Sequence, residues 1–183
     1  MTGLVILGNG FEISEALVPC DYYFRAGIKT IKASIYNHLE VISQEGIKVV
    51  ADTTLDEVDL SAFDFLFIPG GKASFTVLDK DERVSKIIKY FVDNNKLVTS
   101  ICAAPFLIGR LGYFENRKYT CFPSFEQYVT KGTYLKEEGV VVDGNFITAK
   151  SVYYATPFAL EVIKKLLGEE VSSKVLLQIK AEA

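Results

Sequence analysis

Histidine is almost absent from this sequence, because His38 is the only one among 183 residues. It lies early in the chain, in a predicted loop or short strand, outside any motif that would pair it with a nucleophile. A cysteine–histidine catalytic pair needs the imidazole within hydrogen-bond reach of the thiol, so we do not expect one here. We predict that His38 is an exposed loop residue.

Cysteine is also scarce, with three widely spaced residues at Cys20, Cys102 and Cys121. An odd number at this spacing argues against a disulfide framework, and no C-x-x-C pair indicates a zinc site. The sequence therefore predicts neither a metal nor another cofactor. We interpret Cys20 and Cys121 as packing residues and treat Cys102 separately, because of its position after a predicted strand.

Long apolar runs and basic clusters are missing as well. No stretch approaches 18 consecutive apolar residues, so no transmembrane helix and no membrane partner are predicted. The net charge is −3 and no basic run is available to neutralise phosphates, which argues against a nucleic-acid partner. No positively charged segment precedes the first apolar run, so a signal peptide is not expected and a cytoplasmic location is predicted.

Strand and helix patterns alternate along the chain. Short apolar runs typical of buried parallel strands occupy residues 4–7, 63–68 and 97–101. Further strands are predicted at residues 28–34 and 47–51, and a hairpin at residues 139–148 around Asp143-Gly144. Helices are predicted at residues 11–25 with a kink or late start caused by Pro19, at 84–92, at 103–111, from Pro157 as first residue, and at 169–179.

This alternation predicts one α/β domain spanning residues 1–183, with a mainly parallel sheet and helices on both faces. A hydrophobic content of 49% is enough for a full core in a chain of this length. Ligands in such sheets bind beyond the carboxyl ends of the strands. We therefore looked for chemistry where the predicted strands end.

Cys102 is the main candidate at that edge. It directly follows the strand at residues 97–101 and precedes a helix, and the small residues Ala103 and Ala104 come next. An abrupt strand-to-helix turn of this kind resembles a nucleophile elbow. Free N–H groups at the helix start would lower the pKa of the thiol. The alternative is a buried and inert cysteine, which is a common fate of free thiols.

Two other segments end at the same edge. Gly70 and Gly71 would bring bare backbone there, and their N–H groups could form half of an anion hole, although a plain turn is the alternative. Glu15 lies in the first turns of the first predicted helix. A protonated carboxyl group at this place could donate to a thiolate or a sulfinate, whereas the alternative is an ordinary surface glutamate.

At these positions the sequence resembles the ThiJ/PfpI superfamily, and within it the Parkinson-disease-protein branch, whose members are described as deglycases or chaperone-like proteins. The resemblance covers nearly the whole chain and its most specific motif is the cysteine followed by Ala-Ala-Pro. The segments that carry it are LVILGNGFEISEALVPCDYYFRAGIK at residues 4–29, FDFLFIPGG at 63–71 and VTSICAAP at 98–105.

The resemblance implies a flavodoxin-like three-layer sandwich, a homodimer and a site without cofactors. Cys102 matches the reactive, readily oxidised cysteine of the branch, and Glu15 matches the glutamate that hydrogen-bonds it. Gly71 and Ala103 match two backbone N–H donors beside the sulfur. Arg25 matches an arginine that reaches the site of the partner subunit.

One departure concerns the pocket. Glyoxalase-type members of the branch carry a histidine in a T-H-P context, and Phe122 occupies that position here. The loss of this histidine predicts weak or altered glyoxalase activity. A second departure is Glu45, which stands where the branch often has an arginine near the dimer interface.

Three functions remain open from the sequence. The first is a protein of the oxidative or carbonyl stress response that uses Cys102 as an oxidisable thiol. The second is a cofactor-free glyoxalase or deglycase acting on methylglyoxal or its adducts. The third is a holdase chaperone or small-ligand binding protein. Several aromatic residues could form an apolar ligand wall, although we favour a core position for them: Phe11, Phe106, Phe122, Tyr153 and Tyr154.

Overall fold

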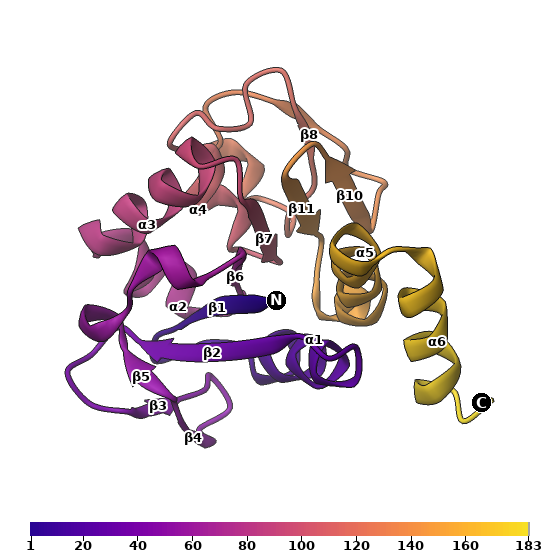
Figure 1. The fold of residues 1–183 in the computed structure, drawn as a ribbon. Helices are drawn as coiled ribbons and strands as arrows, with labels where there is room; N and C mark the ends of the chain where they lie inside the picture. The colour runs from indigo at the N-terminus through magenta and orange to yellow at the C-terminus, as the bar shows by residue number, and fades with distance from the viewer. Residues whose placement is uncertain (183) are drawn as a thin grey trace.

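The chain folds into a seven-stranded sheet with helices on both faces, as the ribbon in Figure 1 shows. The computed structural model describes residues 1–182. Six neighbouring strands are parallel and only the edge strand β10 is antiparallel. In spatial order the strands are β10 (Val140–Asp143), β11 (Phe146–Ala149), β7 (Leu97–Ile101), β6 (Phe65–Ile68), β1 (Thr2–Leu7), β2 (Lys29–Ser34) and β5 (Thr53–Thr54).

The helices form the two outer layers of a flavodoxin-like α/β sandwich, which confirms the predicted fold class. Helices α1 (Ile13–Arg25) and α5 (Ala155–Leu167) pack together on one face, and α6 (Glu169–Ile179) packs against α5. Helices α2 (Ala73–Thr76), α3 (Glu82–Asp93) and α4 (Pro105–Gly109) lie on the other face (Figure 1).

The apolar runs in the sequence explain why β1, β6 and β7 occupy the centre. Every residue of β6 and β7 is buried, as expected for strands covered by helices on both faces. Tyr23 of α1 packs edge-to-face on Phe65 and Phe67 of β6, with ring centroids 5.6 and 6.1 Å apart. These contacts fix α1 against the sheet and thereby fix the position of its first turn.

Several helix boundaries differ from the predicted ones. Helix α1 begins at Ile13 and continues through Pro19, which is buried within it. The prediction that Pro157 is the first residue of α5 is wrong, because the helix begins at Ala155. Pro157 is tolerated there because N–H groups in the first turn have no partner within the helix. In the predicted helix at residues 103–111, only α4 is regular α-helix.

The predicted strand at residues 47–51 forms outside the main sheet. Strand β4 (Lys48–Val50) pairs antiparallel with β3 (Glu40–Ile42) in a separate hairpin, while β5 occupies the sheet edge. Lys48 and Val50 are exposed, because this segment is not apolar on both faces. A second short pair consists of β8 (Lys118–Tyr119) and β9 (Thr133–Tyr134).

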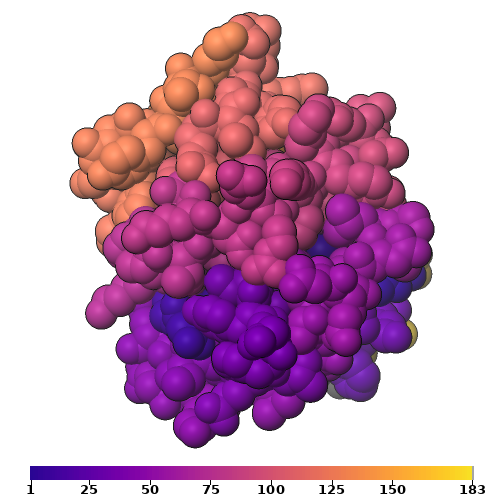
Figure 2. Space-filling view, turned by 90° about the vertical axis from the view of Figure 1, so that its left-hand side faces the viewer, coloured from indigo at the N-terminus to yellow at the C-terminus, as the bar shows by residue number. Residues whose placement is uncertain are grey.

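The carboxyl ends of the parallel strands face one side of the molecule. Strands β1 and β2 run toward the left of Figure 1, and Figure 2 shows the molecule from that side. On this face the first half of the chain, in indigo to magenta, meets the later segments in salmon to orange. The loops that follow β1, β6 and β7 therefore come together on this side.

Candidate functional site

The structure brings the predicted site segments together at the carboxyl edge of the sheet. Cys102 follows β7, Gly70 and Gly71 follow β6, and the loop after β1 leads into α1. Phe11 of that loop forms a β-bridge with Gly71, so the loop after β1 and the loop after β6 are joined directly. The three loops thus form one continuous surface around the sulfur of Cys102.

Cys102 has a strained backbone, as predicted for an elbow between strand and helix. Its φ angle is 64°, in the left-handed region that non-glycine residues rarely occupy. Two hydrogen bonds hold it there, from the Cys102 N–H to the Ala149 carbonyl at 2.8 Å and from the Phe122 N–H to the Cys102 carbonyl at 2.7 Å. Strain retained in this way is typical of functional sites.

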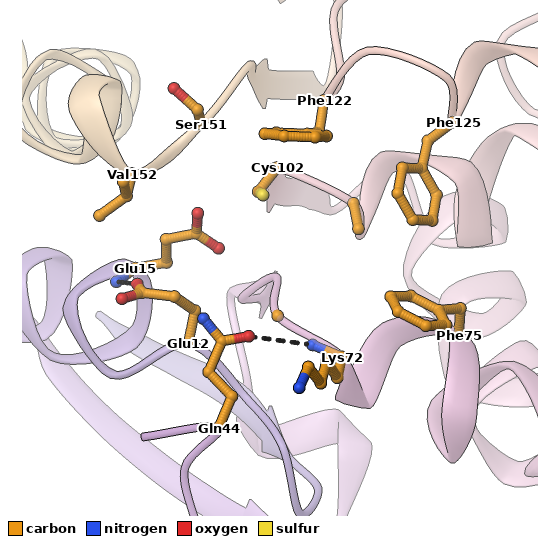
Figure 3. A pocket seen from close by; sticks show the side chains of 12 residues that line it. Glu12, Glu15, Gln44, Lys72, Phe75, Cys102, Phe122, Phe125, Ser151 and Val152 are labelled. Atoms are coloured by element: carbon orange, nitrogen blue, oxygen red, sulfur yellow. Dashed lines mark hydrogen bonds between the residues drawn. The ribbon is translucent and has the colours of Figure 1, made fainter.

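Glu15 is a buried carboxyl group beside that sulfur. It lies in the first turn of α1, where its backbone N–H donates to the side chain of Glu12 at 2.5 Å. The residue is only 1% exposed, and Figure 3 shows its side chain pointing into the pocket near Cys102. Its Oε2 atom has no hydrogen-bond partner of good geometry among the described residues.

Burial raises the pKa of Glu15 from its ordinary value of 4.5 to about 7. A hydrogen bond with the Cys102 thiol opposes this rise, and the negative charge of Glu12 adds to it. The carboxyl group is therefore able to hold or release a proton near neutral pH. This environment excludes the alternative of an ordinary surface glutamate.

The thiol of Cys102 shows the opposite of the predicted shift. Burial raises its pKa, and the charge of Glu15 and the hydrogen bond to it raise the pKa further. The prediction of a lowered pKa is wrong because α4 begins only at Pro105, has five residues and starts with a residue that lacks an N–H group. Backbone N–H groups of Ala103 and Gly71 oppose the rise, since both donate to the sulfur.

The two groups must therefore be considered together. While Glu15 is charged, it repels a thiolate; once it is protonated, the repulsion disappears and the carboxyl group becomes a donor to the sulfur. A thiolate at Cys102 is consequently favoured in the state in which Glu15 holds the proton. Burial raises the thiol pKa values of Cys20 and Cys121 to about 11 and about 12, and the pKa of Cys102 is raised further than either.

Gly70 makes the close approach of these groups possible. A Cβ atom at this position would lie 2.7 Å from the Cβ of Cys102 and would collide with Oε2 of Glu15. Gly71 has a φ angle of 88°, and a Cβ there would collide with the backbone of Glu12. The glycine pair is therefore a requirement of the site and not simply a turn.

An open pocket of about 330 Å³ lies over the sulfur. In Figure 3 the ring of Phe122 lies above Cys102. Most of the other lining residues come from loops and turns that no sequence motif identifies. The pocket is lined by Glu12, Glu15, Gln44, Gly71, Lys72, Phe75, Cys102, Ala103, Phe122, Phe125, Ser151 and Val152.

Other predicted residues lie elsewhere. Arg25 is at the far end of α1, where its Nε donates to Asp21 at 2.9 Å, and it does not line the pocket of its own chain. Its contact with a partner subunit stays a prediction. His38 is an exposed loop residue, as predicted. Its ring stacks on that of Tyr36. Cys121 is buried in the core. Cys20 is partly buried and packs against the core from outside.

The aromatic residues for which we favoured a core position divide between core and surface, so that prediction is wrong for Phe122 and Tyr153. Phe11 and Phe106 are buried, whereas Phe122 and Tyr153 are exposed. Within residues 1–182, no three side chains of the types that bind metals lie close enough together to hold an ion. None of the helices in this part of the chain combines the length and apolar character needed to cross a membrane.

Comparison with known proteins places this site in a family. Residues 1–165 match the sequence profile of the DJ-1/PfpI family. The chain is 30% identical to the protein dj-1beta of Drosophila melanogaster over 175 residues, which cover 95% of this chain and 94% of that protein. It is 32% identical over 168 residues to the DJ-1 homolog B of Arabidopsis thaliana, covering 91% of this chain but only 38% of that longer protein.

Solved structures agree with this result. The crystal structure of Drosophila melanogaster DJ-1beta superimposes with a TM-score of 0.91 at 29% identity, covering 100% of this chain and 98% of the other. A mutant of a DJ-1 superfamily protein from Salmonella typhimurium superimposes with a TM-score of 0.90 at 29% identity and the same coverage. Sequence match and fold agree, and the chain belongs to the DJ-1/PfpI family.

Proposed function

We propose that this protein acts in the response to oxidative or carbonyl stress, with Cys102 as an oxidisable thiol that is paired with Glu15. The observation that carries the proposal is the buried carboxyl group of Glu15, with its pKa of about 7, facing a sulfur in an open pocket. Two backbone N–H groups, from Gly71 and Ala103, donate to the same sulfur. Hydrogen-bond donors therefore surround the position where negative charge would develop.

Oxidation at this site needs only hydrogen peroxide. The thiolate attacks one peroxide oxygen, which forms an S–O bond, breaks the O–O bond and releases hydroxide, leaving a sulfenic acid. The sulfenate attacks a second peroxide in the same way and releases water, which leaves a sulfinate. Protonated Glu15 and the N–H groups of Gly71 and Ala103 would donate to the new oxygens, and such charge-assisted bonds are strong.

Glyoxalase or deglycase activity is the second candidate, and the open pocket over the thiol favours it. The thiolate would add to the aldehyde carbon of methylglyoxal, and the carbonyl oxygen would take the proton of Glu15 to give a hemithioacetal. Glu15 would then move a proton from that carbon to its neighbour, and water would hydrolyse the resulting thioester to lactate and the free thiol. A proton-transferring group contributes about 10²–10⁴-fold, so with Phe122 in place of histidine we expect weak turnover.

The same proposal includes a cytoplasmic homodimer, without a cofactor, a nucleic acid or a membrane partner. Exposed apolar side chains support the dimer, because Phe24 of α1 is 79% exposed and Val50 of β4 is 69% exposed. Apolar surface of this kind is typical of protein interfaces. A holdase chaperone or small-ligand binding protein remains the third candidate.

Two variants of Glu15 separate the first two candidates. Glu15→Gln keeps a hydrogen-bond donor but has no proton to transfer, whereas Glu15→Leu removes both functions. We expect Glu15→Gln to form the sulfinate after mild peroxide and to lose methylglyoxal turnover. Glu15→Leu should lose both.

The readouts are mass spectrometry of the Cys102 peptide and an assay of lactate formation. Strong wild-type turnover that disappears in Cys102→Ser would favour the enzyme over the sensor. Sulfinate formation that is equal in Glu15→Gln and Glu15→Leu would contradict the role of Glu15 as the donor.

A further inference from the structure

We propose that an aromatic subsite adjoins the Cys102 pocket and selects reactive carbonyl compounds that carry an aryl group. This inference rests on the proposed addition of the Cys102 thiolate to aldehydes. It concerns a second hollow of about 430 Å³ on the side of α4 and the loop that follows Phe122. The residues that line this hollow are Phe75, Asp79, Phe106, Ser124, Phe125, Gln127 and Tyr128.

The two hollows adjoin each other. Phe75 and Phe125 line both of them, and their ring centroids are 5.5 Å apart. Figure 3 shows these two rings beside each other, on the side of Cys102 away from Glu15. A group attached to a carbonyl carbon at the sulfur would therefore extend directly onto the two rings.

The subsite offers open aromatic surface. Phe106 and Tyr128 complete the cluster, with centroids 5.5 and 6.1 Å from that of Phe125. Phe106 is buried and forms the floor, whereas Phe75 is 45% and Tyr128 is 55% exposed. Rings that only completed a core would be covered, so these rings leave room for another ring to stack in the offset or edge-to-face arrangements that aromatic groups prefer.

The charged and amide side chains at the hollow have partners, although Oδ1 of Asp79 makes an ion pair and no hydrogen bond within the described residues. The carboxylate of Asp79 pairs with Arg110 at 2.7 Å. The side chain of Gln127 donates to the Ser124 carbonyl at 2.6 Å. An aryl group would therefore displace water from the rings without leaving a buried charge or amide unpaired. Unpaired buried polar groups are the main cost when an apolar group binds at a polar surface.

The combined space is larger than methylglyoxal requires. At about 30 Å³ for each heavy atom, the volume of one water molecule in the liquid, methylglyoxal needs on the order of 150 Å³. The pocket over Cys102 provides about 330 Å³ and the adjoining hollow about 430 Å³. An arylglyoxal uses the second hollow as well, with its aldehyde carbon bonded to sulfur and its oxygen protonated by Glu15.

Alkylation of Cys102 tests the subsite without any turnover. The rates for iodoacetamide and its N-benzyl derivative are measured by peptide mapping, and their ratio is compared with the ratio for glutathione. We expect the wild type to favour the benzyl reagent by roughly three- to tenfold. Tyr128→Ala should reduce this preference, whereas Tyr153→Ala, which removes an exposed ring outside both hollows, should leave it unchanged. Equal preference in the wild type and Tyr128→Ala would overturn the subsite.

A second arm tests the carbonyl class. Phenylglyoxal should protect Cys102 from iodoacetamide at a lower concentration than methylglyoxal, and the difference should shrink in Tyr128→Ala. Equal protection by the two compounds would overturn the proposed selectivity. A benzyl preference without protection by either carbonyl would support the aromatic subsite and count against carbonyl addition at Cys102, so the two proposals fail separately.

Discussion

Glu15 is kept in a place that destabilises the fold at neutral and alkaline pH. Its folded-state pKa of about 7 lies above its ordinary value of 4.5, so the folded protein binds this proton more tightly than the unfolded chain. Stability therefore falls as the pH rises from about 4.5 to about 7 and stays low above that. A shift of this size corresponds to about 3 kcal/mol. This loss of folding stability indicates that the carboxyl group of Glu15 is retained for function.

We predict that Glu15→Gln stabilises the protein at pH 8 by about 2–3 kcal/mol and changes little at pH 4, where the carboxyl group is neutral in both states. Urea unfolding at equal protein concentration measures both values. Glu82→Gln, an exposed change at the start of α3, is the control and should have almost no effect at either pH. An equal gain for Glu15→Gln at both pH values would contradict the assignment of the raised pKa.

Phe122 stands where the family resemblance leads us to expect a histidine in glyoxalase-type members. We predict that Phe122→His increases methylglyoxal turnover by at least about tenfold, because it supplies a second proton-transferring group above Cys102. Phe125→His is the matched control, since Figure 3 shows that ring beside Phe75 and not over the sulfur. A steady-state assay of lactate formation decides the point, and equal gains in both variants would refute it.

At the level of secondary-structure elements, the first turn of α1 sets the position of the Glu15 carboxyl group. The Glu12 side chain caps the helix by accepting the N–H of Glu15, and its charge raises the pKa of Glu15. We predict that Glu12→Ala costs about 1 kcal/mol of stability and lowers the pKa of Glu15. Asp81→Ala removes the corresponding cap of α3 and should cost a similar amount without moving that pKa. Urea unfolding and NMR titration of Glu15 measure the two effects; an unchanged pKa in Glu12→Ala would contradict the assigned coupling.

The helices and strands of the structure show which elements could be predicted from the sequence. Continuous apolar runs identified β1, β6 and β7, and the period of apolar residues identified α3, because burial alone determines these patterns. The position of α5 relative to Pro157 was missed, since a proline fits several places in a first turn. The hairpin of β3 and β4 was missed because its partners carry no apolar alternation strong enough to reveal the pairing.

The site was predicted only in part for a similar reason. Cys102 and Gly71 follow apolar strands directly, so their common edge could be inferred from the alternation of strand and helix. Gln44, Phe75 and Phe125 come from loops whose paths depend on tertiary packing. The pKa of Cys102 was predicted in the wrong direction, because neither the burial of Glu15 nor the short length of α4 is visible in the sequence.

At the scale of the whole molecule, the resemblance to the Parkinson-disease-protein branch predicts a homodimer, and the exposed ring of Phe24 in α1 is a candidate contact. Light scattering at micromolar concentration should give twice the mass of one chain, and Phe24→Asp should reduce it to one, because a charge would be buried at the interface. Tyr153→Asp introduces the same charge at another exposed ring and should leave the dimer intact. A wild-type monomer at this concentration would contradict the prediction.

Cys102 is proposed as the oxidisable thiol of this protein, and peroxide treatment followed by peptide mass spectrometry tests that proposal. The wild type is treated with mild hydrogen peroxide, and each cysteine-containing peptide is analysed by mass spectrometry. We predict that the Cys102 peptide gains the mass of two oxygen atoms, as expected for the sulfinate, before Cys20 or Cys121 changes. Oxidation of Cys20 or Cys121 first, or a Cys102 peptide that gains no oxygen, would contradict the account.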